Sequence, residues 1–254
     1  MDYKQRTDSS WNNISVGANV FFRSDTSSPE LLIRGSYVLN GFDYGNYIAE
    51  VNANTPHYKL GRLGLHADLS SFSPDLIYRW YDSNNFIWRN NFSSVKYVKI
   101  FINYELGKYR FNIKVGRIAL NNFVYMNSSA LPDQFNSTIL IDQFVVTKDF
   151  TYRSWHFNNK IVFQKTDHEN IVHLSSLVSD QSLYLEKNYF NNALLAAYGL
   201  TASYNSSYYA NAFMPATALF YLQNTTKTGG YLRLDLFFNA IRPTLILKRY
   251  FPNS

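Results

Sequence analysis

The sequence lacks several features that mark common kinds of soluble protein. It contains no cysteine, so disulfide bonds and thiolate metal sites are excluded. Charged residues make up only 17% of its 254 residues, whereas soluble domains contain about 25%. No apolar run reaches the about 18 residues that a membrane-spanning helix needs. If the chain crosses a membrane, it must cross as a β-barrel, because only helices and closed barrels satisfy their backbone hydrogen bonds in lipid.

Aromatic residues, in contrast, are abundant. The chain has 21 Tyr, 20 Phe and 4 Trp. Many of them flank the predicted turns within residues 78–92 and 204–213, as in the aromatic girdles at the edges of a lipid-facing surface. A soluble β-sandwich with a Tyr-rich core and a sugar-binding aromatic track are the alternative interpretations of this composition.

Residues 110–117 show the main pattern of the sequence. Phe111, Ile113 and Val115 alternate with Asn112 and Lys114, so a strand here would have one apolar and one polar face. The same alternation recurs in residues 62–69, 97–106, 155–164, 194–205 and 232–239. Runs of about 8–12 residues suit the about 9–11 residues of a bilayer-crossing strand better than the about 5–6 residues of an ordinary soluble strand.

The segments between these runs are rich in Ser, Asn, Pro and Gly, which form turns. They are residues 24–29, 71–75, 127–133, 187–192 and 225–230. Together these patterns predict an all-β fold, an antiparallel transmembrane β-barrel of roughly 13–16 long strands.

Charged side chains recur on the polar faces of the predicted strands. A charge that faces lipid near the middle of the bilayer costs about 2–4 kcal/mol, so we expect the polar faces to line a lumen and the apolar faces to meet lipid. The predicted lumen-lining residues are Arg62, His66, Asp68, Lys99, Glu105, Arg110, Lys114, Lys160, Arg233 and Asp235. Bulky residues at inward positions (Phe21, Phe101 and Phe237) favour partial filling of that lumen.

No motif for catalysis, metal binding or a cofactor stands out. The five histidines, at positions 57, 66, 156, 168 and 173, lack metal-ligand spacing, and neither a nucleophile elbow nor a phosphate-binding glycine loop is present. We therefore expect no catalytic residues, no metal and no cofactor. The net charge of +6 comes from scattered Lys and Arg, which predicts no nucleic-acid binding.

One stretch of the sequence resembles a known family. Tyr-Tyr-Ala-Asn-Ala-Phe-Met-Pro at 208–215, Phe-Tyr-Leu-Gln-Asn at 220–224 and the Gly-Gly-Tyr…Asp-Leu-Phe-Phe-Asn-Ala segment at 229–240 are similar to the putative β-barrel porins of the Bacteroidetes outer membrane. The resemblance implies an outer-membrane barrel that passes small solutes, and it implies no catalytic residues. Family members are longer, which predicts that residues 1–254 are one barrel domain without its N-terminal and closing C-terminal parts. The last predicted strand is at 243–251.

Four functions are compatible with this prediction. The first is a passive porin-like channel for small polar solutes, with a mixed-charge lumen and a slight preference for anions. The second is a plugged structural or partner-binding barrel in an outer-membrane assembly. A barrel lipase and a receptor barrel are the others. The expected partners are outer-membrane lipid, small polar solutes, and a second copy of the chain or an outer-membrane protein.

Overall fold

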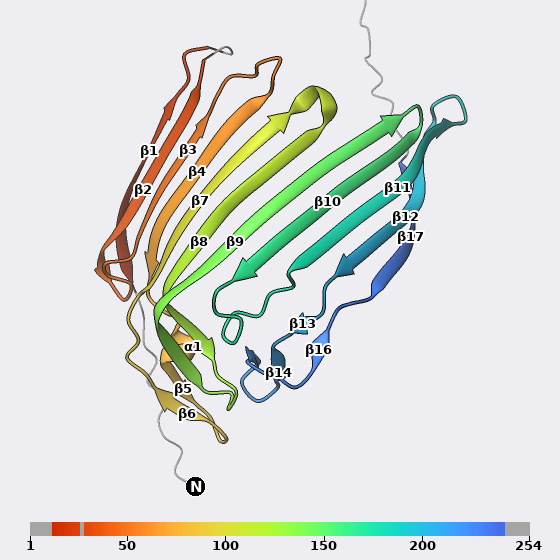
Figure 1. The fold of residues 1–254 in the computed structure, drawn as a ribbon. Helices are drawn as coiled ribbons and strands as arrows, with labels where there is room; N and C mark the ends of the chain where they lie inside the picture. The colour runs from red at the N-terminus through yellow and green to blue at the C-terminus, as the bar shows by residue number, and fades with distance from the viewer. Residues whose placement is uncertain (1–11, 26–27, 242–254) are drawn as a thin grey trace, which may run out of the picture.

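One antiparallel sheet of eleven strands dominates the computed structural model, which describes residues 12–25 and 28–241. Figure 1 shows the sheet as a curved wall. In sheet order its strands are β1 (Asn13–Phe22), β2 (Glu30–Gly41), β3 (Tyr47–Asn54), β4 (Arg62–Phe72), β7 (Val95–Leu106), β8 (Phe111–Met126), β9 (Pro132–Tyr152), β10 (Trp155–Thr166), β11 (Leu177–Tyr189), β12 (Leu194–Asn205) and β17 (Leu232–Ile241). The predicted all-β antiparallel fold is confirmed.

The remaining elements are short and lie in the connections. They are α1 (Leu76–Arg79), the 3-10 turn Gly107–Tyr109, β5 (Trp80–Asp82), β6 (Ile87–Arg89), β13 (Tyr208–Tyr209), β14 (Ala212–Met214), β15 (Leu219–Tyr221) and β16 (Lys227–Thr228). Within the described residues, no helix has the length and apolar character needed to cross a membrane.

The described residues contain fewer long strands than the sequence predicts for the chain. The described residues form eleven sheet strands rather than roughly 13–16, because aromatic-rich segments such as β5–β6 and β14–β15 are hairpins of three-residue strands. β1 and β17 are the two edges of the sheet, and the described residues do not close it into a barrel. The predicted strand at 243–251 lies outside the described residues.

The two ends of the sheet differ in their connections (Figure 1). At the end that we call the short-turn end, the chain reverses within residues 55–61, 107–110, 153–154 and 190–193. At the opposite, long-loop end, the connections include residues 73–94, 167–176 and 206–231. β8 and β9 also extend beyond the rest of the sheet at this end, after a register shift near Asn122.

Two glycines allow close contact between neighbouring strands. A Cβ atom at Gly116 would lie 2.3 Å from the Ile100 carbonyl oxygen and from the Phe101 ring. A Cβ atom at Gly199 would lie 2.3 Å from the Leu183 carbonyl oxygen and 2.5 Å from the Tyr184 Cβ atom. Phe101 and Tyr184 are the residues directly across the strands from these glycines, and the absence of a Cβ atom at each glycine permits the close approach.

The main buried cluster lies toward the long-loop end. Leu120 and Ile139 are opposite each other on β8 and β9, and Ile171 from the loop at 167–176 packs against them. By strand alternation Leu120 shares the face of Lys114. The loop therefore reaches the polar side of the sheet.

Candidate functional site

The strand register brings the predicted lumen-lining residues onto one face of the sheet. A cross-strand row runs from Arg62 on β4 through Glu105 and Lys160 to Arg233 on β17. Residues directly opposite in a sheet point to the same side, so this row defines what we call the polar face.

The other predicted residues lie on the same face. Asp68 is opposite Lys99, and their charged groups are 4.0 Å apart. Residues separated by an even number of positions on one strand point to the same side. By this rule the polar face also includes His66, Lys114 and Asp235, each of which is an even number of positions from a member of the row on its own strand. Arg110, just before β8, donates a hydrogen bond to Thr151 of β9 at 2.9 Å. Thr151 faces the polar side by strand alternation, so Arg110 reaches the same side. That this face lines a lumen stays a prediction.

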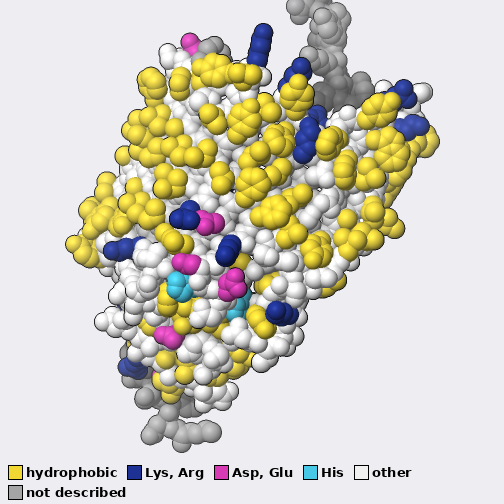
Figure 2. All heavy atoms as spheres, in the orientation of Figure 1, with side chains coloured by type: hydrophobic (Ala, Val, Ile, Leu, Met, Phe, Trp, Pro, Cys, Tyr) yellow, Lys and Arg dark blue, Asp and Glu magenta, His cyan; other side chains and the backbone are white. Residues whose placement is uncertain are grey.

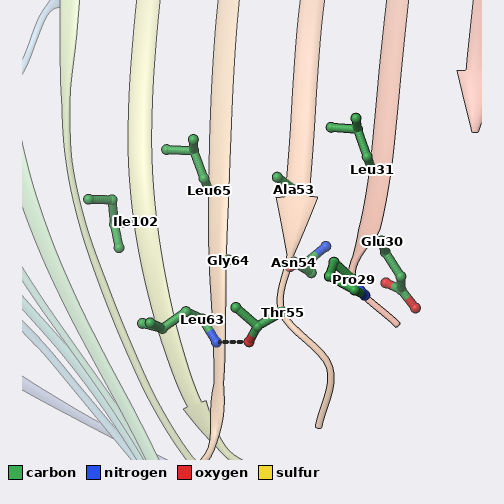
Figure 3. A pocket seen from close by; sticks show the side chains of 10 residues that line it. All are labelled: Pro29, Glu30, Leu31, Ala53, Asn54, Thr55, Leu63, Gly64, Leu65 and Ile102. Atoms are coloured by element: carbon green, nitrogen blue, oxygen red, sulfur yellow. Dashed lines mark hydrogen bonds between the residues drawn. The ribbon is translucent and has the colours of Figure 1, made fainter. Parts of the chain in front are cut away.

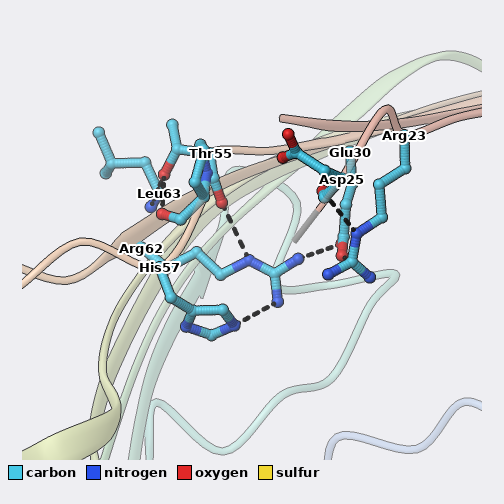
Figure 4. Close-up of polar contacts among 8 residues, drawn as sticks. Arg23, Asp25, Glu30, Thr55, His57, Arg62 and Leu63 are labelled. Atoms are coloured by element: carbon cyan, nitrogen blue, oxygen red, sulfur yellow. Dashed lines mark hydrogen bonds and ion pairs between the residues drawn. The ribbon is translucent and has the colours of Figure 1, made fainter. Parts of the chain in front are cut away.

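An ion-pair network stands at the short-turn end of the polar face (Figure 4). Glu30 accepts from Arg23 at 2.9 Å with one carboxylate oxygen and pairs with Arg62 through the other. The Arg62 guanidinium also donates to the Thr55 carbonyl at 3.2 Å and lies 3.4 Å from the His57 ring nitrogen. Arg62 is thus held on several sides, which fixes its planar group against the wall.

A second network joins β1, β2, β3 and β4. Arg34 donates to Asn19 at 3.1 Å and lies 3.5 Å from a carboxylate oxygen of Glu50. Asn52 donates to Glu50 at 2.7 Å and lies 2.6 Å from the His66 ring nitrogen. The sequence prediction included only His66 from this network, although the alternation of charged and apolar residues around Arg34 and Glu50 was the signal that could have shown the others.

Positive and negative charges nearly balance on the polar face. In the described part of the chain, its Lys and Arg residues are Arg23, Arg34, Arg62, Lys99, Arg110, Lys114, Lys160 and Arg233, and its Asp and Glu residues are Glu30, Glu50, Asp68, Glu105, Asp149, Asp180, Glu186 and Asp235. The expected slight anion preference assumed an excess of Lys and Arg, and this face does not have that excess.

Several charges on the β8–β17 half of this face lack a charged partner among the described residues. Lys160 and Asp180 are opposite each other, but neither has an ion pair or side-chain hydrogen bond among the described residues. Lys114 lies 4.2 Å from the centre of the Phe101 ring. Phe101 is buried beneath it, whereas Phe21 is largely exposed, so bulky inward residues fill the polar side only locally.

The opposite, apolar face exposes large hydrophobic side chains over most of the sheet. Val115, Phe144 and Phe163 form one cross-strand row, and Phe163 is 48% exposed. On the edge strand Leu236 is 87% exposed. Figure 2 shows a face on which such side chains are nearly continuous. Soluble monomers rarely expose apolar patches beyond a few hundred Å².

A shallow groove on the apolar face lies near the short-turn end (Figure 3). Its volume is about 530 Å³, and Leu31, Ala53, Leu63, Leu65 and Ile102 supply most of its apolar lining. The small Ala53 side chain between longer neighbours makes the depression. The lining of the groove is apolar, like the rest of this face, so the groove does not stand out as a separate binding site.

The sequence of residues 1–250 matches the family described as putative porin. The chain belongs to the putative porin family. No curated protein and no solved structure matches it. The family points to a porin-like role in an outer membrane, and to a channel rather than an enzyme.

The histidines of this porin-family chain are dispersed. His57 lies by Arg62, His66 by Asn52, His156 by Tyr184, His168 by Asp167 and His173 by Asn211. Burial raises the pKa of Asp167, but hydrogen bonds from His168 and from the Leu140 N–H outweigh it and hold the pKa below its usual value. Among the described residues, no group of three or more His, Asp or Glu side chains is placed to hold a metal ion.

Proposed function

We propose that this protein is a passive, porin-like channel of an outer membrane, in which the polar face lines a water-filled lumen and the apolar face meets lipid. The two-faced sheet is the observation that supports this proposal. One face presents exposed Leu, Val and Phe side chains, and the other presents charges and ion-pair networks. Each charge placed in mid-bilayer would cost about 2–4 kcal/mol, so only one arrangement of the two faces suits a membrane.

The solutes that fit such a wall are small and polar. Carboxylates, cations, amides and hydroxyls alternate along the polar face, so it can replace the hydrogen bonds of a hydrated solute without favouring one sign of charge. The proposed setting is a closed barrel in a Bacteroidetes outer membrane. A closed barrel would leave the backbone of neither edge strand unpaired in lipid.

Current across a planar bilayer, after the purified chain is folded in detergent, tests the proposal. Discrete and stable conductance steps are expected. Two variants on β11 identify the conducting face. Ser182 is on the polar face and Leu183 on the apolar face. Ser182→Trp should lower the conductance of each step because the indole occupies lumen volume, whereas Leu183→Trp should leave it unchanged.

Equal conductance in both variants would contradict the assignment of the polar face to the lumen. Silence from protein whose circular dichroism shows a folded β-sheet would contradict an open channel. It would support the second candidate function.

That second candidate is a plugged or partner-binding barrel, and the loops of the long-loop end favour it. The Tyr81 hydroxyl donates to the Ala216 carbonyl at 2.8 Å, which joins the loops at 73–94 and 206–231. The Leu222 N–H bonds to the Met126 carbonyl at 2.9 Å at the extended end of β8. Such a set of joined loops could close the mouth or receive an outer-membrane partner or a second copy of the chain. Co-purification of a stoichiometric partner would support this candidate.

A further inference from the structure

A charged row crosses the apolar face toward the long-loop end. Arg117, Asp142 and Lys165 are register partners on β8, β9 and β10, and each is two residues beyond the apolar row of Val115 and Phe163. Arg117 binds Asp142 with two hydrogen bonds, at 2.6 and 2.9 Å. Both side chains are more than half exposed. These charges therefore belong to the outward surface and are not buried in the wall.

The surface stays polar beyond this row, toward the long-loop end. A pocket of about 620 Å³ is bordered by the row and by Asp167, Glu169 and Asn170 from the following loop. The Asp167 carboxylate accepts from the Leu140 N–H at 2.8 Å. Figure 2 shows charged side chains gathered in the lower part of the view, below the continuous hydrophobic region. The apolar surface thus ends at the Arg117 row.

The opposite boundary of the apolar surface is aromatic and basic. Tyr152 and Trp155, which flank the turn between β9 and β10, are both more than half exposed. Lys148 also points outward, but its amine donates to the Tyr109 carbonyl at the neighbouring short turn and passes 4.8 Å from the centre of the Phe150 ring. A lysine that extends along apolar surface to place its amine at a turn is typical of a membrane interface.

The distance between the two boundaries suits a bilayer. Asp142 and Tyr152 lie on β9 and are separated by ten residue positions. With a rise of about 3.3 Å per residue and a tilt of about 40°, they would be about 25 Å apart along the membrane normal. The apolar band of outer-membrane barrels has about this height.

We infer that the outward surface of β8–β10 contacts lipid only between these boundaries, with the Arg117–Asp142–Lys165 row at the headgroup level of one leaflet and the aromatic and basic turns at the headgroup level of the other. The partner of this surface is the bilayer itself. The inference rests on the membrane placement within the proposed function, but it does not depend on conduction.

Depth measurements at single cysteines test the inference, and the native chain has no cysteine to interfere. Phe163→Cys, Lys165→Cys and Lys160→Cys, all on β10, are each labelled with a nitrobenzoxadiazole dye and reconstituted in phosphatidylcholine vesicles. Mid-chain spin-labelled lipid should quench the dye at 163 strongly. The same mid-chain lipid should quench the dye at 165 only weakly, and headgroup-labelled lipid should quench that dye more strongly. The dye at position 160, on the polar face, should be quenched by neither lipid, and the unlabelled Lys160→Cys protein should react with a water-soluble thiol reagent.

Val115→Cys and Asp142→Cys repeat the comparison on β8 and β9, in case a β10 variant fails to fold. Mid-chain quenching at 165 or 142 as strong as at 163 would overturn the boundary, even if the channel conducts. Water access at 163 in a conducting protein would also overturn it. The expected depth profile in a protein that never conducts would support the boundary while contradicting the channel, so the two failures are distinguishable.

Discussion

Lys160 and Asp180 are the charges on the polar face whose roles are simplest to separate. They are opposite each other on β10 and β11, and neither has an ion pair among the described residues. A fixed charge at a pore wall raises the local concentration of ions of the opposite sign. Because both signs occur in nearly equal number on this face, removing a single charge should change the balance measurably.

Lys160→Gln should therefore shift the reversal potential in a salt gradient toward cation preference, and Asp180→Asn should shift it toward anion preference. Lys165→Gln is the matched control, since Lys165 is on the same strand but on the apolar face. Planar-bilayer recordings in a KCl gradient measure all three. Shifts of the same sign for both polar-face variants, or a shift for Lys165→Gln as large as theirs, would contradict the assignment of faces.

Gly116 offers a test of the fold at a single residue. An alanine Cβ there would lie 2.3 Å from the Ile100 backbone oxygen, which cannot move aside without bending the strand. Gly116→Ala should lower the free energy of unfolding by about 1–3 kcal/mol, as overpacking does. In Gly35→Ala, the control, the nearest atom to the new Cβ is 3.9 Å away, so its effect should stay within about 0.5 kcal/mol. Urea unfolding in detergent measures both, and equal values would refute the argument.

Residue alternation alone predicted which side chains share a face, because a strand has only two faces. Arg62, Lys114 and Arg233 could be grouped in this way before any pairing was known. The charged row of Arg117 and Asp142 could not be predicted from the sequence. Each residue is one charged residue at an otherwise apolar position of its strand, and only the strand register shows that the two are partners.

Among the secondary-structure elements, the six alternating runs located in the sequence are all strands of the sheet, and their partners were predictable only across short turns. β4 pairs with β7 and β12 pairs with β17 across long loops that contain strands of their own. The sequence pattern does not indicate which of several nearby strands becomes the hydrogen-bonded neighbour, because the choice of neighbour depends on how the loops pack. Of β8 only residues 110–117 were predicted, because the register shift near Asn122 interrupts the alternation while the pairing continues. β9 was not among the predicted strands.

The difference between the short turns and the long loops predicts how the protein is inserted. Outer-membrane barrels have short periplasmic turns and longer extracellular loops. A membrane-impermeant maleimide added to intact cells should therefore label Thr225→Cys, in the loop at 206–231, and should not label Arg153→Cys, in the turn between β9 and β10. After cell lysis both should react, which controls for access to each thiol. The reverse labelling pattern would mean the opposite insertion.

For the whole molecule, strand direction restricts how the wall can close. Eleven strands that are antiparallel at every step place β1 and β17 in the same direction. Direct pairing of these two edges would be parallel, whereas bacterial single-chain barrels are antiparallel with an even number of strands. An antiparallel barrel that contains this wall therefore needs an odd number of further strands between β17 and β1, whatever their source.

Disulfide trapping distinguishes direct closure from closure through intervening strands. Ala18→Cys is combined in turn with cysteine at Leu232, Leu234, Leu236 and Phe238, the outward positions along β17. No pair should form a disulfide in the folded protein, because even one intervening strand separates them by about 10 Å, whereas a disulfide needs Cβ atoms about 3.5–4.5 Å apart. Ala18→Cys with Gly35→Cys, direct partners on β1 and β2, should cross-link readily, which shows that the thiol introduced on β1 is reactive. A β1–β17 cross-link as efficient as this control would mean that the two edges meet directly in a parallel pairing, and the strand-parity argument would then fail.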